Sequence, residues 1–395
     1  MSWEKMKLKD VCISISDGDH QPPPKANKGV PFVTISNITH TNQFDFSNTM
    51  FVPQEYYDGL DSKRKVQEGD VLYSVVGSFG IPVYIKNNTP FVFQRHIAIL
   101  RPNVYKIAPQ FLYYTMLNRD FYLKADAAAI GAAQRTVSLT ALRNMEIEIP
   151  HIETQKKVAK ILSSYDNLIE NHQKQIKLLE EAAQRLYKEW FVDLRFPGYE
   201  NVKIVDGVPE GWTKPSINDI ADYLNGYAFK PDDWSDKGKP IIKIKEMNEG
   251  ITSSTPRNDG SAIDEKYNVI AGDILFSWSA TLAAMIWDSE DGLLNQHLFK
   301  VTPNNGVCRE YVLQSILKTL DEFKNLTTGS TMKHIQRGKL KEVFVNLPSQ
   351  EIMDKFASIA DVYREIVLRL QKQNSALKEA RDRLLPRLMS EEIEV

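Results

Sequence analysis

The sequence predicts an α+β protein in which two globular modules are each followed by a long helix, and in which the two helices pair as an antiparallel coiled coil. Three observations predict this organisation: an internal repeat that spans most of the chain, short β-branched and aromatic runs bounded by turn residues, and two matching heptad patterns. At 395 residues the chain is also longer than one hydrophobic core normally serves, so we expect more than one domain.

The internal repeat is the strongest of these signals. Residues 131–190 align without gaps to residues 329–388 at an offset of 198 residues. The aligned pairs begin with Gly131 and Gly329, Leu142 and Leu340, and Pro150 and Pro348. With small insertions the repeat continues upstream, where Val33-Thr34-Ile35 matches Ile242-Lys243-Ile244. The sequence therefore predicts modules at 1–150 and 200–348, followed by helical segments at 151–199 and 349–395.

Within each module the pattern is mixed. Runs such as Val71 to Val76 and Ile97 to Leu100 are bounded by Gly, Pro and Asn, which is typical of short strands. Pro109 suits the first turn of a short helix that buries Phe111, Leu112, Met116 and Leu117. The order of the strands does not follow from the sequence.

The helical segments carry apolar residues at alternating steps of four and three, which is the pattern of a coiled-coil seam. The first seam consists of Tyr165, Ile169, His172, Ile176, Leu179, Ala183, Leu186 and Trp190. The second consists of Tyr363, Val367, Leu370, Asn374, Leu377, Arg381, Leu384 and Leu388. We expect the seams to pair as a spacer on the order of 57 Å long, with Asn374 and Arg381 setting the register and His172 packed in the seam.

Composition limits the function classes. The formal net charge is −2, and residues 1–150 and 201–348 contain 16 and 17 basic against 14 and 20 acidic residues, so a nucleic-acid-binding face must come from local clusters. No apolar run approaches the roughly 18 residues of a membrane span. The charged start of the chain and the presence of only Cys12 and Cys308 favour the cytoplasm.

Motifs for catalysis are missing from the sequence. It contains no Gly-Lys-Ser or Gly-Lys-Thr phosphate loop, no G-x-G-x-x-G and no H-E-x-x-H. Pro22-Pro23-Pro24 lacks the flanking residues with which an amino-methyltransferase holds a flipped base. Asp17-Gly18-Asp19-His20 offers possible metal ligands but is also typical of a turn, so we predict no metal site, no cofactor and no catalytic residue.

Taken together, the repeated order of module and heptad helix resembles the specificity subunit of type I restriction-modification systems. The resemblance rests on Pro150 with Gln155, on Pro348 with Gln350, and on the Gln173-Lys174-Gln175 to Arg185-Leu186 run with its second copy. Asn225-Gly226-Tyr227-Ala228-Phe229-Lys230 is similar to a recurrent opening of that family's target-recognition domains, whereas the first copy reads Asp17-Gly18-Asp19-His20-Gln21-Pro22. The resemblance covers nearly the whole chain.

The resemblance implies two target-recognition domains, each reading one half of a bipartite double-stranded DNA site, with the helices fixing the gap. It also implies modification methyltransferase subunits that use S-adenosylmethionine, and restriction endonuclease subunits that act as ATP-dependent translocases, as partners. The chain itself is then a recognition subunit and not an enzyme.

Candidate DNA-contacting residues are polar side chains near predicted strand ends and in basic clusters, because such groups read base edges or hold phosphates. In the first module they are Lys63, Arg64, Lys65, Ser78, Arg95, His96, Gln134, Arg135 and Thr136. In the second they are Lys243, Lys245, Ser277, Trp278, Gln296, His297, Lys333 and His334. Each of these residues also has an ordinary interpretation as a surface or buried structural side chain. The competing hypotheses are a coiled-coil scaffold that does not bind DNA and, with less support, a fused enzyme.

Overall fold

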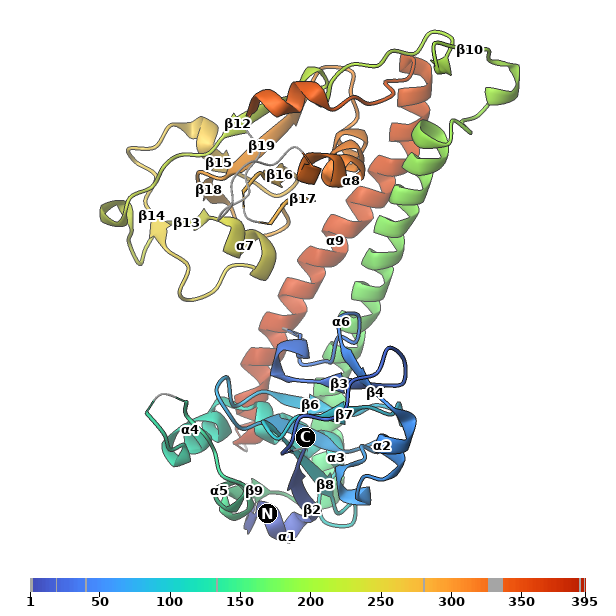
Figure 1. Ribbon diagram of the computed structural model, residues 1–395. Helices are drawn as coiled ribbons and strands as arrows, with labels where there is room; N and C mark the ends of the chain where they lie inside the picture. Colours follow the sequence, from blue (N-terminus) through green and yellow to red (C-terminus); the bar gives the residue numbers. More distant parts are fainter. Residues whose placement is uncertain are drawn as a thin grey trace. The chain divides into compact units, whose positions relative to one another are not determined.

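The computed structural model describes residues 3–18, 20–39, 41–132, 134–279, 281–325, 337–390, 392, 393 and 395 (Figure 1). Asp19, Gly329, Lys333 and His334, which the sequence analysis singled out, lie outside these residues. The chain forms two compact units, one of residues 1–168 and 377–395 and the other of residues 169–376.

The first unit contains nine strands among its described residues. They are β1 (Glu4–Lys7), β2 (Cys12–Asp17), β3 (Val30–Val33), β4 (Met50–Val52), β5 (Val71–Ser74), β6 (Pro82–Tyr84), β7 (Val92–Phe93), β8 (Ile97–Pro102) and β9 (Glu146–Ile149). An antiparallel sheet has the order β2-β8-β5-β6, and a second sheet has the order β4-β3-β7 with β3 and β7 parallel. β1 pairs with β9. Short helices connect these strands: α1 (Leu8–Val11), η1 (Ile35–Asn37), α2 (Gln54–Asp58) and η2 (Ser62–Arg64).

Three further helices, α3 (Pro109–Leu117), α4 (Arg119–Ala128) and α5 (Leu139–Asn144), close the first module. Pro109 stands at the first turn of α3, where its missing N–H has no partner to lose. Phe111, Leu112 and Met116 are fully buried, and Leu117 packs against the same core, as the sequence predicts.

The second unit repeats this strand order. Its strands are β10 (Ile204–Val205), β11 (Val208–Pro209), β12 (Ala221–Asn225), β13 (Lys239–Ile242), β14 (Arg257–Asn258), β15 (Asn268–Val269), β16 (Ile274–Ser277), β17 (Ala283–Ile286), β18 (Gly292–Leu294) and β19 (Leu298–Pro303). One sheet has the order β12-β19-β16-β17 and the other β14-β13-β18-β15. Each strand of the first unit's two sheets therefore has a counterpart at the same place in the sheets of the second unit. The second unit adds β15 at the edge of its second sheet, next to β18.

Helices of the second unit include a π-helical turn, η3 (Lys188–Val192), and the 3-10 turns η4 (Tyr199–Asn201), η5 (Ile217–Asp219), η6 (Pro231–Asp233), η7 (Glu265–Tyr267) and η8 (Arg337–Glu342). The α-helices are α7 (Ile244–Glu249) and α8 (Arg309–Asn325). Leu340 in η8 is fully buried like its repeat equivalent Leu142 in α5, so the repeat in sequence is a repeat in packing.

The long helices are α6 (Ile152–Tyr187) and α9 (Gln350–Met389), of 36 and 40 residues. Every residue of the two predicted seams is buried or half-buried, which confirms the heptad assignment. Within the second unit, His172 lies against Asn374 and Trp190 against Phe356, so the helices run antiparallel. Within the first unit, Asp166 of α6 forms an ion pair with Arg381 of α9, which fits the same antiparallel arrangement.

An aromatic cluster joins these helices to the second module. Phe356 of α9 is fully buried, and its ring centroid lies 4.9 Å from Phe191 and 6.0 Å from Trp190. Phe191 also packs edge-on against Tyr311 of α8 at 4.9 Å. The turn η3, which follows α6, therefore shares one core with the start of α9 and with α8.

We predict that Phe356→Ala lowers the free energy of unfolding of this unit by about 3–5 kcal/mol, because it leaves a cavity in that cluster. The matched control is Phe344→Ala, since Phe344 is 60% exposed and its loss should cost at most about 0.5 kcal/mol. Urea unfolding followed by tryptophan fluorescence measures both variants. Equal losses for the two variants would show that the cluster is not a shared core.

Candidate nucleic-acid interface

Three segments that the sequence analysis singled out in the first module lie side by side. The Val75 N–H donates to the His96 carbonyl at 2.8 Å, and the Gly77 N–H donates to the Arg135 carbonyl at 3.0 Å. Ser78, the Arg95-His96 turn and Gln134 to Thr136 therefore gather where β5 ends and β8 begins. The structure assembles this predicted set into one surface.

The side chains of this set differ in how free they are to bind. Ser78, Arg95 and Gln134 are exposed. Arg135 forms an ion pair with Asp126 and lies over the Phe79 ring, with 5.5 Å from guanidinium carbon to ring centroid. The Thr136 hydroxyl donates to the Gln134 carbonyl at 3.3 Å. Ser78, Arg95 and Gln134 are therefore the members best placed to reach a ligand.

His96 is half-buried in the turn that precedes β8. Burial, and then the positive charge of neighbouring Arg95, lower the pKa of His96 below its usual 6.5. The imidazole is therefore neutral at pH 7, and it has one donor and one acceptor nitrogen.

The basic turn at Lys63, Arg64 and Lys65 is held from beneath by a buried ion pair. Arg101 pairs with Asp70 at 2.9 Å and also donates to the Lys65 carbonyl at 2.8 Å. The Ser16 hydroxyl donates to the Lys63 carbonyl at 2.9 Å. These bonds fix the backbone of the turn while the Lys63 side chain is exposed.

Lys65 is less available than Lys63. Its ammonium donates to the Asp58 carbonyl at 2.8 Å and lies 5.3 Å from the centre of the Tyr57 ring. Arg64 is half-buried. Lys63 is thus the member of this turn that presents its charge most openly.

In the second module, the turn between β18 and β19 organises the predicted residues. The Asn295 N–H donates to the Ile242 carbonyl at 3.1 Å, which brings this turn next to Lys243. The Trp278 N–H donates to the His297 carbonyl at 3.3 Å, and the two rings lie 5.1 Å apart. Lys243, Trp278, Gln296 and His297 therefore form one cluster.

Two aromatic contacts position polar groups in this cluster. The Trp278 indole N–H donates to Asn225 Oδ1 at 3.1 Å, which orients the exposed Asn225 amide. The Lys243 ammonium lies 4.2 Å above the ring of Trp234, itself 47% exposed, in a cation–π contact. An aromatic face and a cation thus share this surface.

His297 has a backbone conformation that side chains rarely adopt. Its φ is +77°, and its Nδ1 atom is buried with no hydrogen-bond partner among the described residues. Such a conformation costs on the order of 1–3 kcal/mol and is found preferentially at functional sites. The paired strands on either side hold the turn in this shape.

The structure corrects one predicted contact and leaves two unplaced. Ser277 is fully buried and its hydroxyl donates to the Ser279 carbonyl at 3.1 Å, so the side chain faces the core rather than a ligand. It is the last residue of β16, and there its side chain points inward. Lys245 is exposed on α7. Lys333 and His334 lie outside the described residues.

The glycines in the two module openings, Gly18 and Gly226, take equivalent places in the structure. A Cβ on Gly18 would lie 2.0 Å from the Phe93 carbonyl oxygen, and one on Gly226 would lie 2.1 Å from the Asn295 carbonyl oxygen. Each glycine lets its chain pass directly against the turn that carries the candidate residues. The signal in the sequence is the glycine that follows β2 in one copy and β12 in the other.

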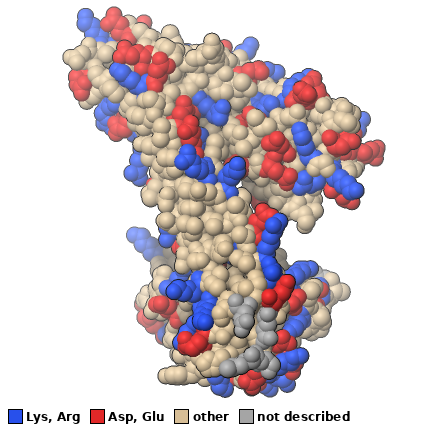
Figure 2. Space-filling model, turned by 180° about the vertical axis from the view of Figure 1, so that it is seen from behind, with Lys and Arg blue, Asp and Glu red and all other residues tan. Residues whose placement is uncertain are grey.

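Charges of both signs are mixed on one face of the molecule. Figure 2 shows Lys and Arg interspersed with Asp and Glu on the face that it presents. His20 Nε2 lies 3.0 Å from Asp17 Oδ2, and among the described residues no three His, Cys, Asp or Glu side chains gather as a metal would require. No described helix is both long enough and apolar enough to cross a bilayer.

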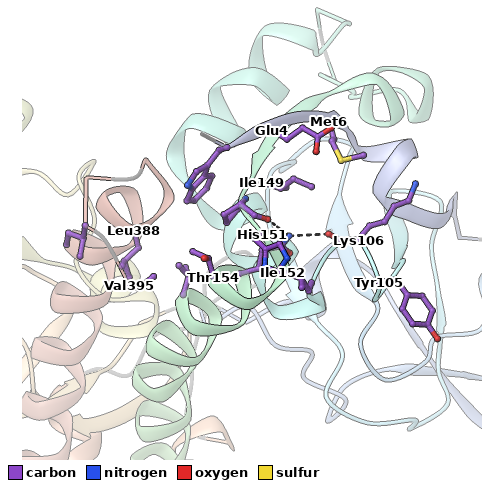
Figure 3. A pocket seen from close by; sticks show the side chains of 15 residues that line it. Glu4, Met6, Tyr105, Lys106, Ile149, His151, Ile152, Thr154, Leu388 and Val395 are labelled. Carbon is purple, nitrogen blue, oxygen red and sulfur yellow. Dashed lines mark hydrogen bonds between the residues drawn. The ribbon is translucent and has the colours of Figure 1, made fainter. Parts of the chain in front are cut away.

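A pocket of about 890 Å³ opens in the first unit, beside β1, β9 and the first turns of α6 (Figure 3). Gln155 anchors one wall: its Oε1 accepts from the Ala108 N–H at 2.9 Å, and its Nε2 donates to the Lys106 and Pro150 carbonyls at 3.1 and 2.9 Å. None of the described residues predicted to contact DNA lines this pocket. Pro150 and Gln155, which carry part of the family resemblance, therefore have a structural role at the start of α6.

Comparisons with known proteins agree with this architecture. A model of the type I restriction modification DNA specificity domain matches residues 1–181 and 209–379. The chain is 28% identical to the MjaIX specificity subunit of Methanocaldococcus jannaschii, over 100% of this chain and 94% of the relative. It is 22% identical to the HindI specificity subunit of Haemophilus influenzae, over 99% of both.

A solved structure supports the same fold. The S subunit of a type I restriction-modification system from M. genitalium superposes with a TM-score of 0.58 at 16% identity, covering 98% of this chain and 96% of that one. The chain therefore belongs to the type I restriction-modification specificity subunits, which are the non-catalytic recognition subunits of those systems.

Proposed function

We propose that this chain binds double-stranded DNA at a bipartite site and directs the other subunits of its complex to that site. In this proposal residues 1–150 and 200–348 are the target-recognition domains, and residues 151–199 and 349–395 are the central and distal helices that set the gap between half-sites. The assignment rests on the duplicated strand order of the two modules.

The observation that carries the proposal is one framework that presents two different sets of side chains. In both modules a tight turn between equivalent strands, β7 to β8 and β18 to β19, packs against a glycine that has no room for a Cβ. The first module presents Ser78, Arg95 and Gln134 around this turn, and the second presents Lys243, Gln296 and His297. Arg95 and Gln296 stand at equivalent positions of the two turns and offer different donors, which suits two readers of different sequences.

These residue types match base edges. Arg and Lys donate to the O6 and N7 acceptors of guanine, while Gln and Asn pair with N6 and N7 of adenine. Lys63, Arg64, Lys65 and Lys245 suit phosphates, since such contacts position the protein without reading sequence. The buried Arg101–Asp70 pair supports this role for the basic turn by fixing its backbone.

The partners in this proposal are modification methyltransferase subunits docked along α6 and α9, and restriction endonuclease subunits that translocate DNA. S-adenosylmethionine and ATP belong to those subunits, and the complex works in the cytoplasm. A scaffold that does not bind DNA is the second candidate, and the net charge of −2 favours it. Binding that weakens steeply with salt distinguishes the reader from the scaffold.

We predict that Gln134→Ala relaxes sequence preference in one half-site and Gln296→Ala in the other. Loss of a bidentate base contact costs about 1–3 kcal/mol of discrimination at the base concerned. Selection from a randomised DNA library by the complex with its methyltransferase subunits measures both preferences. The control is Gln184→Ala, an exposed glutamine on α6. If either variant altered both half-sites, separate reading by the two modules would be refuted.

Lys63→Ala should weaken binding to all sequences alike, because a phosphate contact carries no base information. The slope of log affinity against log salt should fall in magnitude by about 1. Lys63→Arg keeps the charge and serves as the control. Titrations at several salt concentrations measure the slope, and a change in sequence preference would instead make Lys63 a base contact.

A further inference from the structure

Polar residues interrupt the hydrophobic seam between α6 and α9, and each of them meets a complementary group. His172 Nδ1 lies 3.0 Å from Asn374 Oδ1, and both residues are buried. The Arg381 guanidinium lies 2.6 Å from Asp166 Oδ1, with both side chains about 20% exposed. Polar groups in such a seam are costly unless they are paired, so they restrict which helices fit together.

A third polar group joins the helices in the second unit. Arg364 of α9 lies 2.9 Å from buried Glu310 of α8 and 3.8 Å from Glu180 of α6. The Glu180 side chain is 49% exposed, so water and salt screen that contact. The Glu310 carboxylate also accepts from Gln314 Nε2, and this arrangement holds Arg364 against the module.

The internal repeat shows what each helix would meet in a second copy of itself. Every residue of α6 has an equivalent 198 positions later in α9. The equivalent pairs that matter are Asp166 and Arg364, His172 and Leu370, Ile176 and Asn374, Glu180 and Lys378, and Ala183 and Arg381. None of these substitutions preserves the charge or hydrogen bond of the original.

If α9 paired with a second α9 in the same way, Arg364 would take the place of Asp166 and face Arg381. Leu370 would take the place of His172 and leave the Asn374 amide without its partner. Lys378 would replace Glu180 next to Arg364. Self-pairing of α9 therefore brings like charges together and buries an unpaired amide.

Self-pairing of α6 fails for a different reason. Ala183 would take the place of Arg381, so Asp166 would lose its cation. Ile176 would replace Asn374 and leave the His172 ring without its hydrogen bond. Asp166 would also stand where Arg364 stands now, next to Glu180.

We propose that α6 and α9 form a heterotypic pairing surface, in which each half of the chain fits the other half and disfavours a second copy of itself. The partner selected by α6 is a helix with Asn at position 374, Arg at position 381 and Arg at position 364. This selectivity keeps two different modules in one subunit. It does not depend on whether the modules read DNA.

The test reproduces the self-pairing contacts inside the intact chain. Asp166→Arg with His172→Leu gives α6 the residues of α9, and Asn374→Ile with Arg381→Ala gives α9 the residues of α6. Both double variants should lower the midpoint of thermal unfolding by roughly 5–10 °C, the first more than the second because it adds repulsion. Exchange of the exposed pair Glu379 and Arg383, which are 63% and 79% exposed, is the control and should change the midpoint by at most about 1 °C.

A reciprocal exchange separates pairing from simple damage. Asp166→Arg with Arg381→Asp, together with His172→Asn and Asn374→His, keeps both pairs with their members reversed. Because the Tyr114 hydroxyl donates to Asp166 Oδ2 at 2.6 Å, reference and variants carry Tyr114→Phe in this comparison. The exchange should recover at least half of the decrease in unfolding midpoint that the two self-pairing double variants show. The proposal would be overturned if the two self-pairing double variants were as stable as the reference, or if the exchange recovered none of the decrease in midpoint.

Discussion

The antiparallel packing of α6 against α9 is the constraint on which both units depend. It makes the first unit discontinuous in sequence, since residues 377–395 belong with residues 1–168, whereas the second unit is the continuous stretch 169–376. Leu385, Leu388 and Met389 from the end of α9 lie in the core of the first unit. Tyr187 from the end of α6 and Trp190 from η3 lie in the core of the second. Because each core contains residues from both helical segments, each module packs against residues from the other half of the chain.

The two modules share one framework but present different side chains on it. The strand order, the two glycines without room for a Cβ and the turns that they support are shared, while the exposed side chains around the turns differ. The basic groups are local and anchored, as at Lys63 above the Arg101–Asp70 pair. Near-neutral net charge is therefore compatible with nucleic-acid recognition, because recognition depends on a few positioned groups.

Much of this architecture could be predicted from the sequence, because periodicity and repetition are local signals. The heptad pattern predicts the seams position by position, with Asn374 and Arg381 as polar interruptions. The strand order could not be predicted, since the paired residues of β2 and β8 are 81 to 90 positions apart and nothing in short strands encodes the neighbour.

Individual site residues were harder to predict, because exposure at a strand end depends on which face the side chain takes. Ser277 and Ser78 come near the ends of equivalent strands, yet Ser277 is buried and Ser78 is exposed. The close approach of the chain at Gly18 and Gly226 could not be predicted, because it depends on the turn that packs against each glycine. The strained backbone of His297 leaves no trace in composition, since it arises from tertiary packing.

Mapping of methylated bases in genomic DNA tests the central claim most directly. A host that expresses this chain with its methyltransferase partner would be compared with a host that has the methyltransferase alone, by single-molecule sequencing. The account predicts a bipartite methylated motif, with two different halves and a fixed gap, that disappears when this chain is absent. Unchanged methylation in the presence of an active methyltransferase would contradict the account and favour a scaffold.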